Sequence, residues 1–60
     1  MLEGRLLITG DGDKSVEEIL ENLRVDYDWD SGDRLMINPW YREEIVTALE
    51  DAGYNVDVIY

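Results

Sequence analysis

Three aspartates alternate with larger side chains in the middle of this sequence, at positions 26, 28 and 30. Oxygen ligands at every second residue open the calcium loop of an EF-hand, which also needs Gly at its sixth position and a bidentate Glu at its twelfth. Counted from Asp26, the sixth residue is Ser31, Gly32 comes one residue late, and the twelfth is Ile37. The flanking segments also have the pattern of strands and not of helices. The sequence therefore predicts no calcium site here.

Two other segments match ligand-binding motifs in part. Asp11 and Asp13 form a second pair of oxygen ligands, but a loop that leads into a helix contains such residues without any metal. Lys14 and Ser15 stand in the order of a phosphate-binding loop, but the glycines before them lack the required four-residue spacing. The two aspartates would also repel a phosphate. We therefore expect no metal and no cofactor.

Catalytic chemistry has little support in the composition. The chain contains neither His nor Cys, so it lacks the commonest acid–base group and the thiol nucleophile. A pair of carboxylates can perform acid–base chemistry only in a pocket that separates their pKa values. A chain of 60 residues leaves little room for a ligand cleft of roughly 300 Å³ or more. We expect no catalytic residues and no enzymatic activity.

The net charge is the most unusual property of the sequence. Fifteen acidic residues and five basic residues give a net charge of −10 at pH 7. Direct binding to nucleic acid or to an anionic membrane is disfavoured, because those partners are also negative. A basic protein surface is the matching partner. Adaptation to a salty cytoplasm is a second explanation, because the five basic residues are one Lys and four Arg.

The row of aspartates has two interpretations that its spacing leaves open. On a strand, Asp26, Asp28 and Asp30 lie on one face, about 6.6 Å apart. Two steps along one strand of B-DNA cover about 6.8 Å of the helix axis, so the row can stand in for alternate phosphates. The same charges would also protect the edge of a sheet against unwanted pairing.

The first half of the chain predicts a strand followed by a helix. Residues 5–10 form a short apolar run that ends in Gly, which is typical of a strand. Residues 15–24 have the spacing of an amphipathic helix, and Ser15 with Glu18 forms a capping box at its start. The apolar stripe of this helix is Val16, Ile19, Leu20 and Leu23.

Residues 25–30 and 34–38 predict two strands of a hairpin. Directly opposed residues share a face, so Trp29 can face the core with Leu35 only if an odd number of residues connects the strands. A two-residue turn would instead place Asp28 opposite Leu35 and leave a carboxylate against the core. We therefore expect a loop of three or five residues, with Trp29 opposite Leu35 and Asp30 close to Arg34.

The last third of the chain predicts a helix and a final strand. Asn38 fits the N-cap, Pro39 the first helical position and Gly53 the residue after the C-cap. The expected buried stripe of this helix is Tyr41, Ile45, Ala48, Leu49 and Ala52. The final strand covers residues 54–60, and its expected apolar face is Tyr54, Val56, Val58 and Tyr60.

The order of elements is strand–helix–strand–strand–helix–strand, which predicts a single α+β domain over residues 1–60. This order resembles the ferredoxin-like βαββαβ plan, a four-stranded antiparallel sheet with two helices on one face. In the alternative, residues 25–37 form one strand and a loop, and the sheet has three strands in a βαβαβ order. The ferredoxin-like plan hosts many unrelated functions and so implies none by itself.

Some apolar side chains do not belong to the expected core. Trp40 lies slightly off the stripe of the second helix, which leaves two positions open: a partly exposed Trp beside acids suits an interface anchor, or the side chain folds over the hairpin. Met36 is expected on the open face of the sheet, near Leu7 and Ile59, where it would form a docking or self-association surface. The aromatic residues expected in the core are Tyr27, Trp29, Tyr41 and Tyr54.

No segment of the sequence has the pattern of a membrane span or a signal peptide, so we expect a cytoplasmic protein. The charge and size predict a small module that occupies a basic, nucleic-acid-binding surface of a partner protein. The expected contact residues are Asp26, Asp28, Asp30, Asp33, Glu17, Glu21, Trp40 and Met36.

In size and charge, such a domain resembles the DNA-mimic inhibitors that phages use against host defences, including anti-restriction and anti-CRISPR proteins. The resemblance implies a viral inhibitor that works in the host cytosol. The alternative function is that of a halophilic or generally acidic ferredoxin-like domain, which forms a homodimer through its sheet or binds a small ligand.

Overall fold

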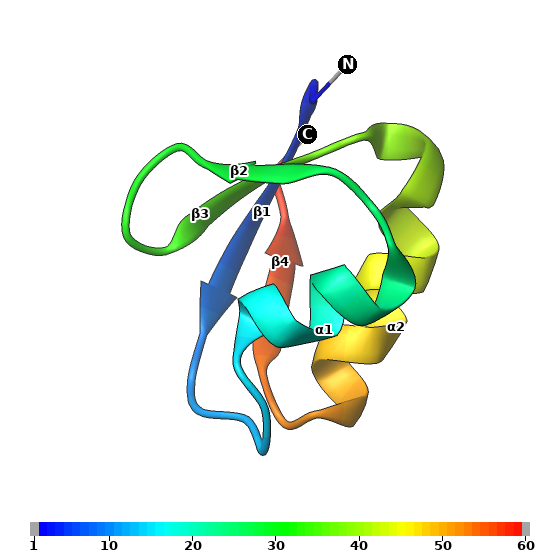
Figure 1. Cartoon of the computed structure of the whole chain (residues 1–60). Coiled ribbons are helices and arrows are strands. Elements are labelled where there is room, and N and C mark those ends of the chain that lie inside the picture. The colour runs from blue at the N-terminus through cyan, green and yellow to red at the C-terminus, as the bar shows by residue number, and fades with distance from the viewer. Residues whose placement is uncertain (1, 60) are drawn as a thin grey trace.

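The computed structural model describes residues 2–59, which form four strands, two α-helices and one 3-10 turn (Figure 1). The sheet has the order β2-β3-β1-β4, and all neighbouring strands are antiparallel. This is the ferredoxin-like arrangement predicted from the sequence. The three-stranded alternative is wrong, because residues 25–37 contain two paired strands. In chain order the elements are β1 (Gly4–Thr9), α1 (Val16–Leu23), β2 (Tyr27–Trp29), β3 (Arg34–Ile37), η1 (Pro39–Tyr41), α2 (Arg42–Asp51) and β4 (Asn55–Val58).

The hairpin of β2 and β3 has the predicted register. Trp29 lies opposite Leu35, and Tyr27 lies opposite Ile37. Residues 30–34 separate the first of these pairs, so the connection is odd in length, as expected. The backbone N–H of Asp30 donates to the carbonyl of Arg34 at 2.9 Å and holds the hairpin closed. β2 itself is shorter than predicted, because residues 25, 26 and 30 lie outside the strand.

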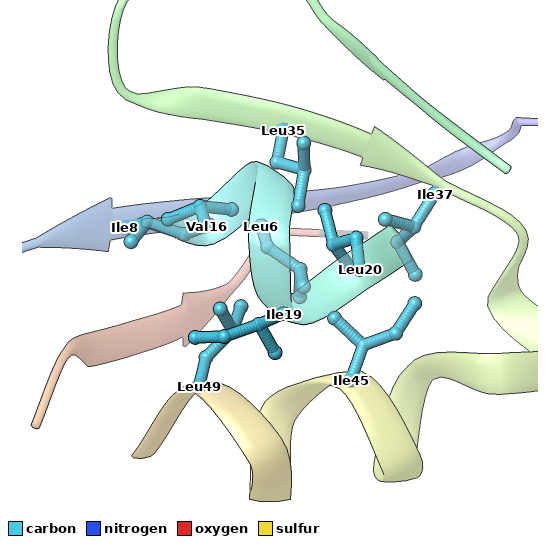
Figure 2. Packing of buried hydrophobic residues seen from close by; sticks show 9 residues of the cluster. All are labelled: Leu6, Ile8, Val16, Ile19, Leu20, Leu35, Ile37, Ile45 and Leu49. Atoms are coloured by element: carbon cyan, nitrogen blue, oxygen red, sulfur yellow. The ribbon is translucent and has the colours of Figure 1, made fainter. Parts of the chain in front are cut away.

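The two helices cover one face of the sheet, and the core lies between the helices and the sheet (Figures 1 and 2). Leu6 is fully buried at the centre, with Leu35 opposite it on one side and Val58 on the other. A row of side chains therefore crosses the helix-facing side of the sheet from Trp29 at one edge to Val58 at the other. The side chains with no exposed surface are Leu6, Leu20, Leu35, Ile37, Ile45 and Leu49.

Local sequence signals explain where the first helix begins. The Ser15 side chain accepts the backbone N–H of Glu18 at 3.2 Å, which confirms the predicted N-cap. Glu17 and Glu18 lie in the first turn, where the positive end of the helix dipole favours acids. The helix ends at Arg24, which has the left-handed conformation with φ 59°.

The second helix begins later than predicted, and this corrects the position of Tyr41. Asn38 does act as a cap and accepts the N–H of Trp40 at 3.0 Å, but a 3-10 turn follows and α2 begins only at Arg42. A 3-10 turn has three residues per turn, so it rotates Tyr41 away from the stripe that Ile45 and Leu49 form. Tyr41 is 38% exposed, and its predicted place in the core is wrong.

The end of α2 and the last strand follow the sequence more closely. Gly53 has φ +109°, a conformation that suits glycine, and comes directly after the C-cap residue Ala52, as predicted. β4 places Val56 opposite Ile8 and Val58 opposite Leu6, so both face the helices. The predicted contribution of Tyr60 to this face lies outside the described residues.

Candidate binding surface

The negative charge of the chain lies entirely on its surface. All 15 Asp and Glu side chains are exposed. Among residues 2–59 there is one ion pair, between Arg5 Nε and Asp30 Oδ2 at 3.7 Å. Most carboxylates therefore face water without a basic partner, and together they create a strong negative potential around the domain.

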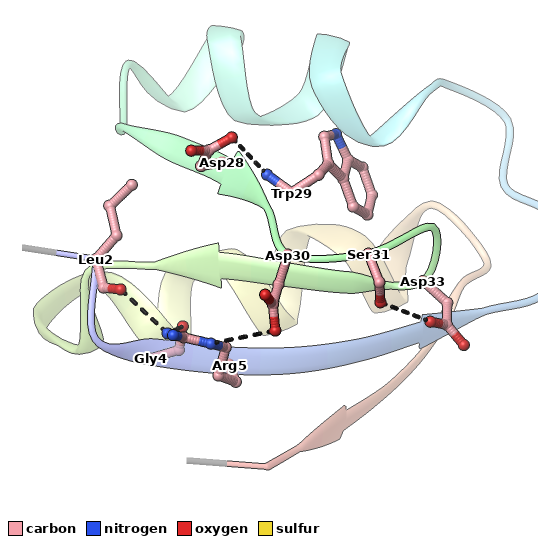
Figure 3. A network of polar contacts seen from close by, with 8 residues as sticks. All are labelled: Leu2, Gly4, Arg5, Asp28, Trp29, Asp30, Ser31 and Asp33. Atoms are coloured by element: carbon pink, nitrogen blue, oxygen red, sulfur yellow. Dashed lines mark hydrogen bonds and ion pairs between the residues drawn. The ribbon is translucent and has the colours of Figure 1, made fainter.

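The aspartate row lies on the face of the sheet that the helices leave open. Asp28 is opposite Met36, and Met36 is opposite Arg5 in the next strand. Figure 3 shows Trp29 pointing toward α1, whereas Asp30 and Arg5 lie on the other side of the sheet. Asp26 comes one residue before β2 and is exposed. The alternation in the sequence thus predicted the correct face for Asp28 and Asp30.

One carboxylate of the row is bonded to the backbone of its own strand. Asp28 Oδ1 accepts the N–H of Trp29 at 2.8 Å (Figure 3). The next N–H, that of Asp30, points toward β3, so the N–H of Trp29 points out of the sheet at its free edge. Asp28 therefore occupies a donor that another strand would need, and charged side chains on an edge strand also discourage such pairing.

The middle of the open face is not acidic. Arg5 and Arg34 lie on the two central strands, with Met36 and Leu7 directly opposite them. Ile59 donates its N–H to the carbonyl of Arg5 at 2.9 Å, so it flanks Arg5 on the side away from Met36. Leu7, Met36 and Ile59 share this face, as predicted. The acids occupy its margins, which are the β2 side and Asp57 on β4.

Sequence reasoning missed Arg5 on this face and named Arg34 only as a neighbour of Asp30, although a signal for both positions exists. Leu6 and Ile8 are core residues, so the period of two places Arg5 on the opposite side of the sheet. Leu35 is also a core residue, so its neighbour Arg34 lies on the opposite side of the sheet as well. Asp30 was expected to approach Arg34; its backbone does, but its carboxylate pairs with Arg5.

The acids predicted on the first helix lie at the same edge as the aspartate row. Desolvation raises the pKa of the Tyr27 phenol, and the carboxylates of Glu21 and Glu17 raise it further. The two glutamates are therefore close enough to the side chain of β2 to affect its charge. Asp33 lies in the hairpin loop and accepts the hydroxyl of Ser31 at 3.4 Å. Glu17 and Glu21 thus lie on the helix side of β2, whereas Asp28 and Asp30 lie on its open side.

Trp40 belongs to a different part of the surface. It is 86% exposed in η1 and lines a hollow with Arg42, Glu43 and Glu44. Asp26 lines another hollow, with Tyr27 and Tyr41 among its neighbours. Of the two positions left open for Trp40, the structure has the exposed one, but Trp40 does not line the hollow that Asp26 shares.

The remaining hollows are shallow. An apolar groove of about 350 Å³ lies between the helices and is lined by Ile19, Leu23 and Ala48, with Asp13, Lys14 and Asp51 among its polar neighbours. Within residues 2–59, no three Asp or Glu side chains are grouped so that they could hold a metal ion. In this part of the chain, no helix has the length and hydropathy to cross a bilayer.

Comparison with known proteins does not assign the chain to a family. No protein-family model, curated protein or solved structure matches it.

Proposed function

We propose that this chain is a small acidic protein-binding module that inhibits its partner by occupying a basic, nucleic-acid-binding surface. The observation that carries the proposal is the set of 15 exposed carboxylates, with one ion pair among residues 2–59. Such a surface attracts a basic partner over long range and speeds the encounter. It equally repels nucleic acid, which the module would displace.

In this proposal the acids around β2 take the place of backbone phosphates. Asp28 and Asp30 supply charge on the open face, Asp26 adds charge directly before β2, and Asp33 adds it in the hairpin loop. Glu17 and Glu21 add charge from α1 on the other side of the same edge. Met36 and Trp40 supply apolar contact, Trp40 from a separate part of the surface.

The mode of action would be that of the phage DNA mimics, which block a defence protein by filling its nucleic-acid groove. It requires no catalysis and no cofactor, and it would operate in the cytosol of an infected host. Asp28 and Asp30 need no new backbone conformation to act, because their exposed carboxylates already stand on a hydrogen-bonded hairpin.

A competition experiment tests this proposal. The immobilised chain is used to capture basic proteins from a bacterial extract, and duplex DNA is then added as the competitor. If the proposal is right, the captured proteins include DNA-binding proteins, DNA releases them, and rising salt weakens their binding. Capture that DNA does not reverse would contradict the proposal.

A pair of variants locates the contact. Asp26, Asp28 and Asp30 are changed to Asn in one protein. In the control, Glu44 and Glu50 are changed to Gln and Asp51 to Asn, which removes the same charge from α2. The first variant should lose at least about tenfold in affinity for a captured DNA-binding protein and the control much less. Equal losses would show that total charge matters and the row does not.

A second function is favoured by the single Lys against four Arg and by the same exposed carboxylates. It is that of a salt-adapted ferredoxin-like domain that self-associates or binds a small ligand. Melting in increasing KCl separates the two proposals. A salt-adapted domain should require molar KCl to fold, whereas the inhibitor should fold at low salt and bind its partner less tightly as salt rises.

A further inference from the structure

β4 is the second edge of the sheet, and its outer backbone groups have no partner among residues 2–59. The N–H of Ile59 donates to Arg5 in the neighbouring strand β1. Because alternate residues of an antiparallel strand point to opposite sides, the N–H groups of Val56 and Val58 point away from the sheet. No side chain of the described residues bonds to them, unlike the N–H of Trp29 at the other edge. β4 therefore offers free donors and acceptors to another strand.

A groove runs beside this edge, between β4 and α2. It has a volume of about 300 Å³ and is lined by Arg42, Glu43, Val46, Thr47 and Val58. Val58 faces the helices but is 52% exposed, because β4 has no neighbour on its outer side. A strand laid along β4 would place alternate side chains in this groove. An open edge next to a groove is the arrangement that proteins use to bind peptides by strand addition.

The charges beside this edge favour a cationic occupant. Asp57 lies on the open face of the sheet, opposite Leu7, and is exposed. Glu43 and Arg42 both line the groove on the helix side and offset each other in charge, so the local preference for a cation comes from Asp57. An opposite charge directly across from Asp57 would stabilise the pairing of two strands, and a like charge would destabilise it. A net charge of −10 adds a general attraction for a basic segment.

A second copy of the chain is a poorer occupant. If Val56 of one copy pairs with Val58 of the other, the two Asp57 residues lie directly opposite each other. These side chains would then be close neighbours of the same charge. Both copies also carry the full negative charge, which opposes their approach.

We propose that β4 binds an extended, cationic segment of a partner protein by strand addition. The backbone of the segment pairs with Val56 and Val58. A Lys or Arg lies beside Asp57, and small apolar side chains pack against Val46 and Val58. The cationic character of the segment rests on the function proposed above, whereas the pairing of backbones does not.

A labelled heptapeptide, Thr-Val-Lys-Val-Lys-Val-Thr, is the probe for this site. Fluorescence anisotropy measures its affinity for the full chain, and amide hydrogen exchange locates it. The peptide should bind and should protect the amides of Val56 and Val58. Methylation of its valine nitrogens removes the N–H groups that would pair with β4 and should weaken binding by about tenfold or more.

Variants of Val58 test the edge itself. The N–H of Val58 makes no bond in the sheet, so Val58→Pro removes a donor for the peptide and no native hydrogen bond. Val58→Thr is the control, because it keeps the N–H and the branched side chain. Once melting curves have shown that both fold, the Pro variant should bind the peptide about tenfold less tightly and the Thr variant nearly as well as the original chain.

The outcomes separate this inference from the proposed function. If a peptide with Glu in place of Lys binds equally well, strand addition stands and the charge basis of the proposed function fails. If the methylated peptide or the Val58→Pro variant binds equally well, strand addition is wrong and charge attraction remains. Absence of binding, protection at Trp29, or protection of Val58 in a dimer without peptide would also overturn the inference.

Discussion

The outward-pointing backbone N–H groups have different surroundings at the two edges of this sheet. At the β2 edge, the outward N–H of Trp29 is bonded to Asp28, and two acids of α1 lie close to Tyr27 of the same strand. At the β4 edge, the outward N–H groups of Val56 and Val58 have no side-chain partner among residues 2–59. A carboxylate is therefore hydrogen-bonded to the backbone of the β2 edge, whereas at the β4 edge the carboxylate of Asp57 lies nearby and makes no such bond within this part of the chain.

The difference between the two edges bears on the role of the acidic row. The sequence left open whether the row mimics phosphates or protects an edge, and Asp28 is in a position to do both. Its Oδ1 blocks the edge donor, while the side chain remains exposed. An unblocked hairpin could pair with the strands of other chains. By preventing this, protection of the edge would keep the aspartates free to bind a partner.

The largest expected effect comes from a substitution in the row of core side chains that connects the two edges. Leu6 is fully buried between Leu35 and Val58, so Leu6→Ala should cost about 2–5 kcal/mol of unfolding free energy. A domain of this size has a total stability of only about 3–9 kcal/mol. Urea denaturation measures the loss. Leu7→Ala, on the open face of the same strand, is the control. An equal loss of unfolding free energy in this variant would mean that the buried row of side chains is not what connects the two edges.

The next effect should appear when the charge beside β4 is removed. Asp57→Thr eliminates the like-charge contact that opposes pairing of two copies, and Thr favours strands. This variant should dimerise at least about tenfold more tightly than the original chain in sedimentation experiments. Asp51→Thr makes the same substitution on α2 and serves as the control. Dimerisation of both variants would attribute the effect to net charge and would remove the distinction between the edges.

A smaller effect is expected when the β2 edge is opened. Asp28→Ala leaves the N–H of Trp29 without its acceptor, so the amide should exchange faster, with a loss of less than about 1 kcal/mol in stability. Asp28→Asn keeps an oxygen acceptor and removes the charge. If exchange at Trp29 is equally fast in both variants, the carboxylate protects the edge by charge alone and its hydrogen bond is unimportant.

The smallest effect concerns the acids of α1 beside the β2 edge. Glu21→Gln should lower the raised pKa of Tyr27, which an absorbance titration of the phenol measures. The folded chain holds this proton more tightly than the unfolded chain does. The corresponding stability is fully present below about pH 10 and is lost as pH rises through the folded pKa, less so in the variant. Glu50→Gln, on α2, should leave the titration of Tyr27 unchanged.

The sequence predicted those features that depend on local pattern. Alternation of size and charge in residues 25–30 was enough to set Trp29 opposite Leu35, because any other register would have buried an aspartate. Ser15 and Gly53 likewise marked the ends of helices through local backbone chemistry. Tyr41 was misplaced because the residues after Asn38 form a 3-10 turn, and a spacing argument that assumes an α-helix cannot detect this.

The features that depend on which strands are neighbours could not be predicted in the same way. The pairing of Asp30 with Arg5 requires a strand from the other end of the chain to lie beside the hairpin. The difference between the outward N–H groups of Trp29 and Val58 depends on the hydrogen-bond phase of each ladder. That phase changes with a shift of one residue and leaves no mark on composition or spacing.

The shared row of side chains from Trp29 through Leu35 and Leu6 to Val58 has a consequence for motion. A segment bound along β4 would limit fraying of β1, and β1 in turn holds β3 and the hairpin. Ligands at opposite margins of the sheet would then reinforce each other without touching, since each would remove disorder that the other must otherwise suppress.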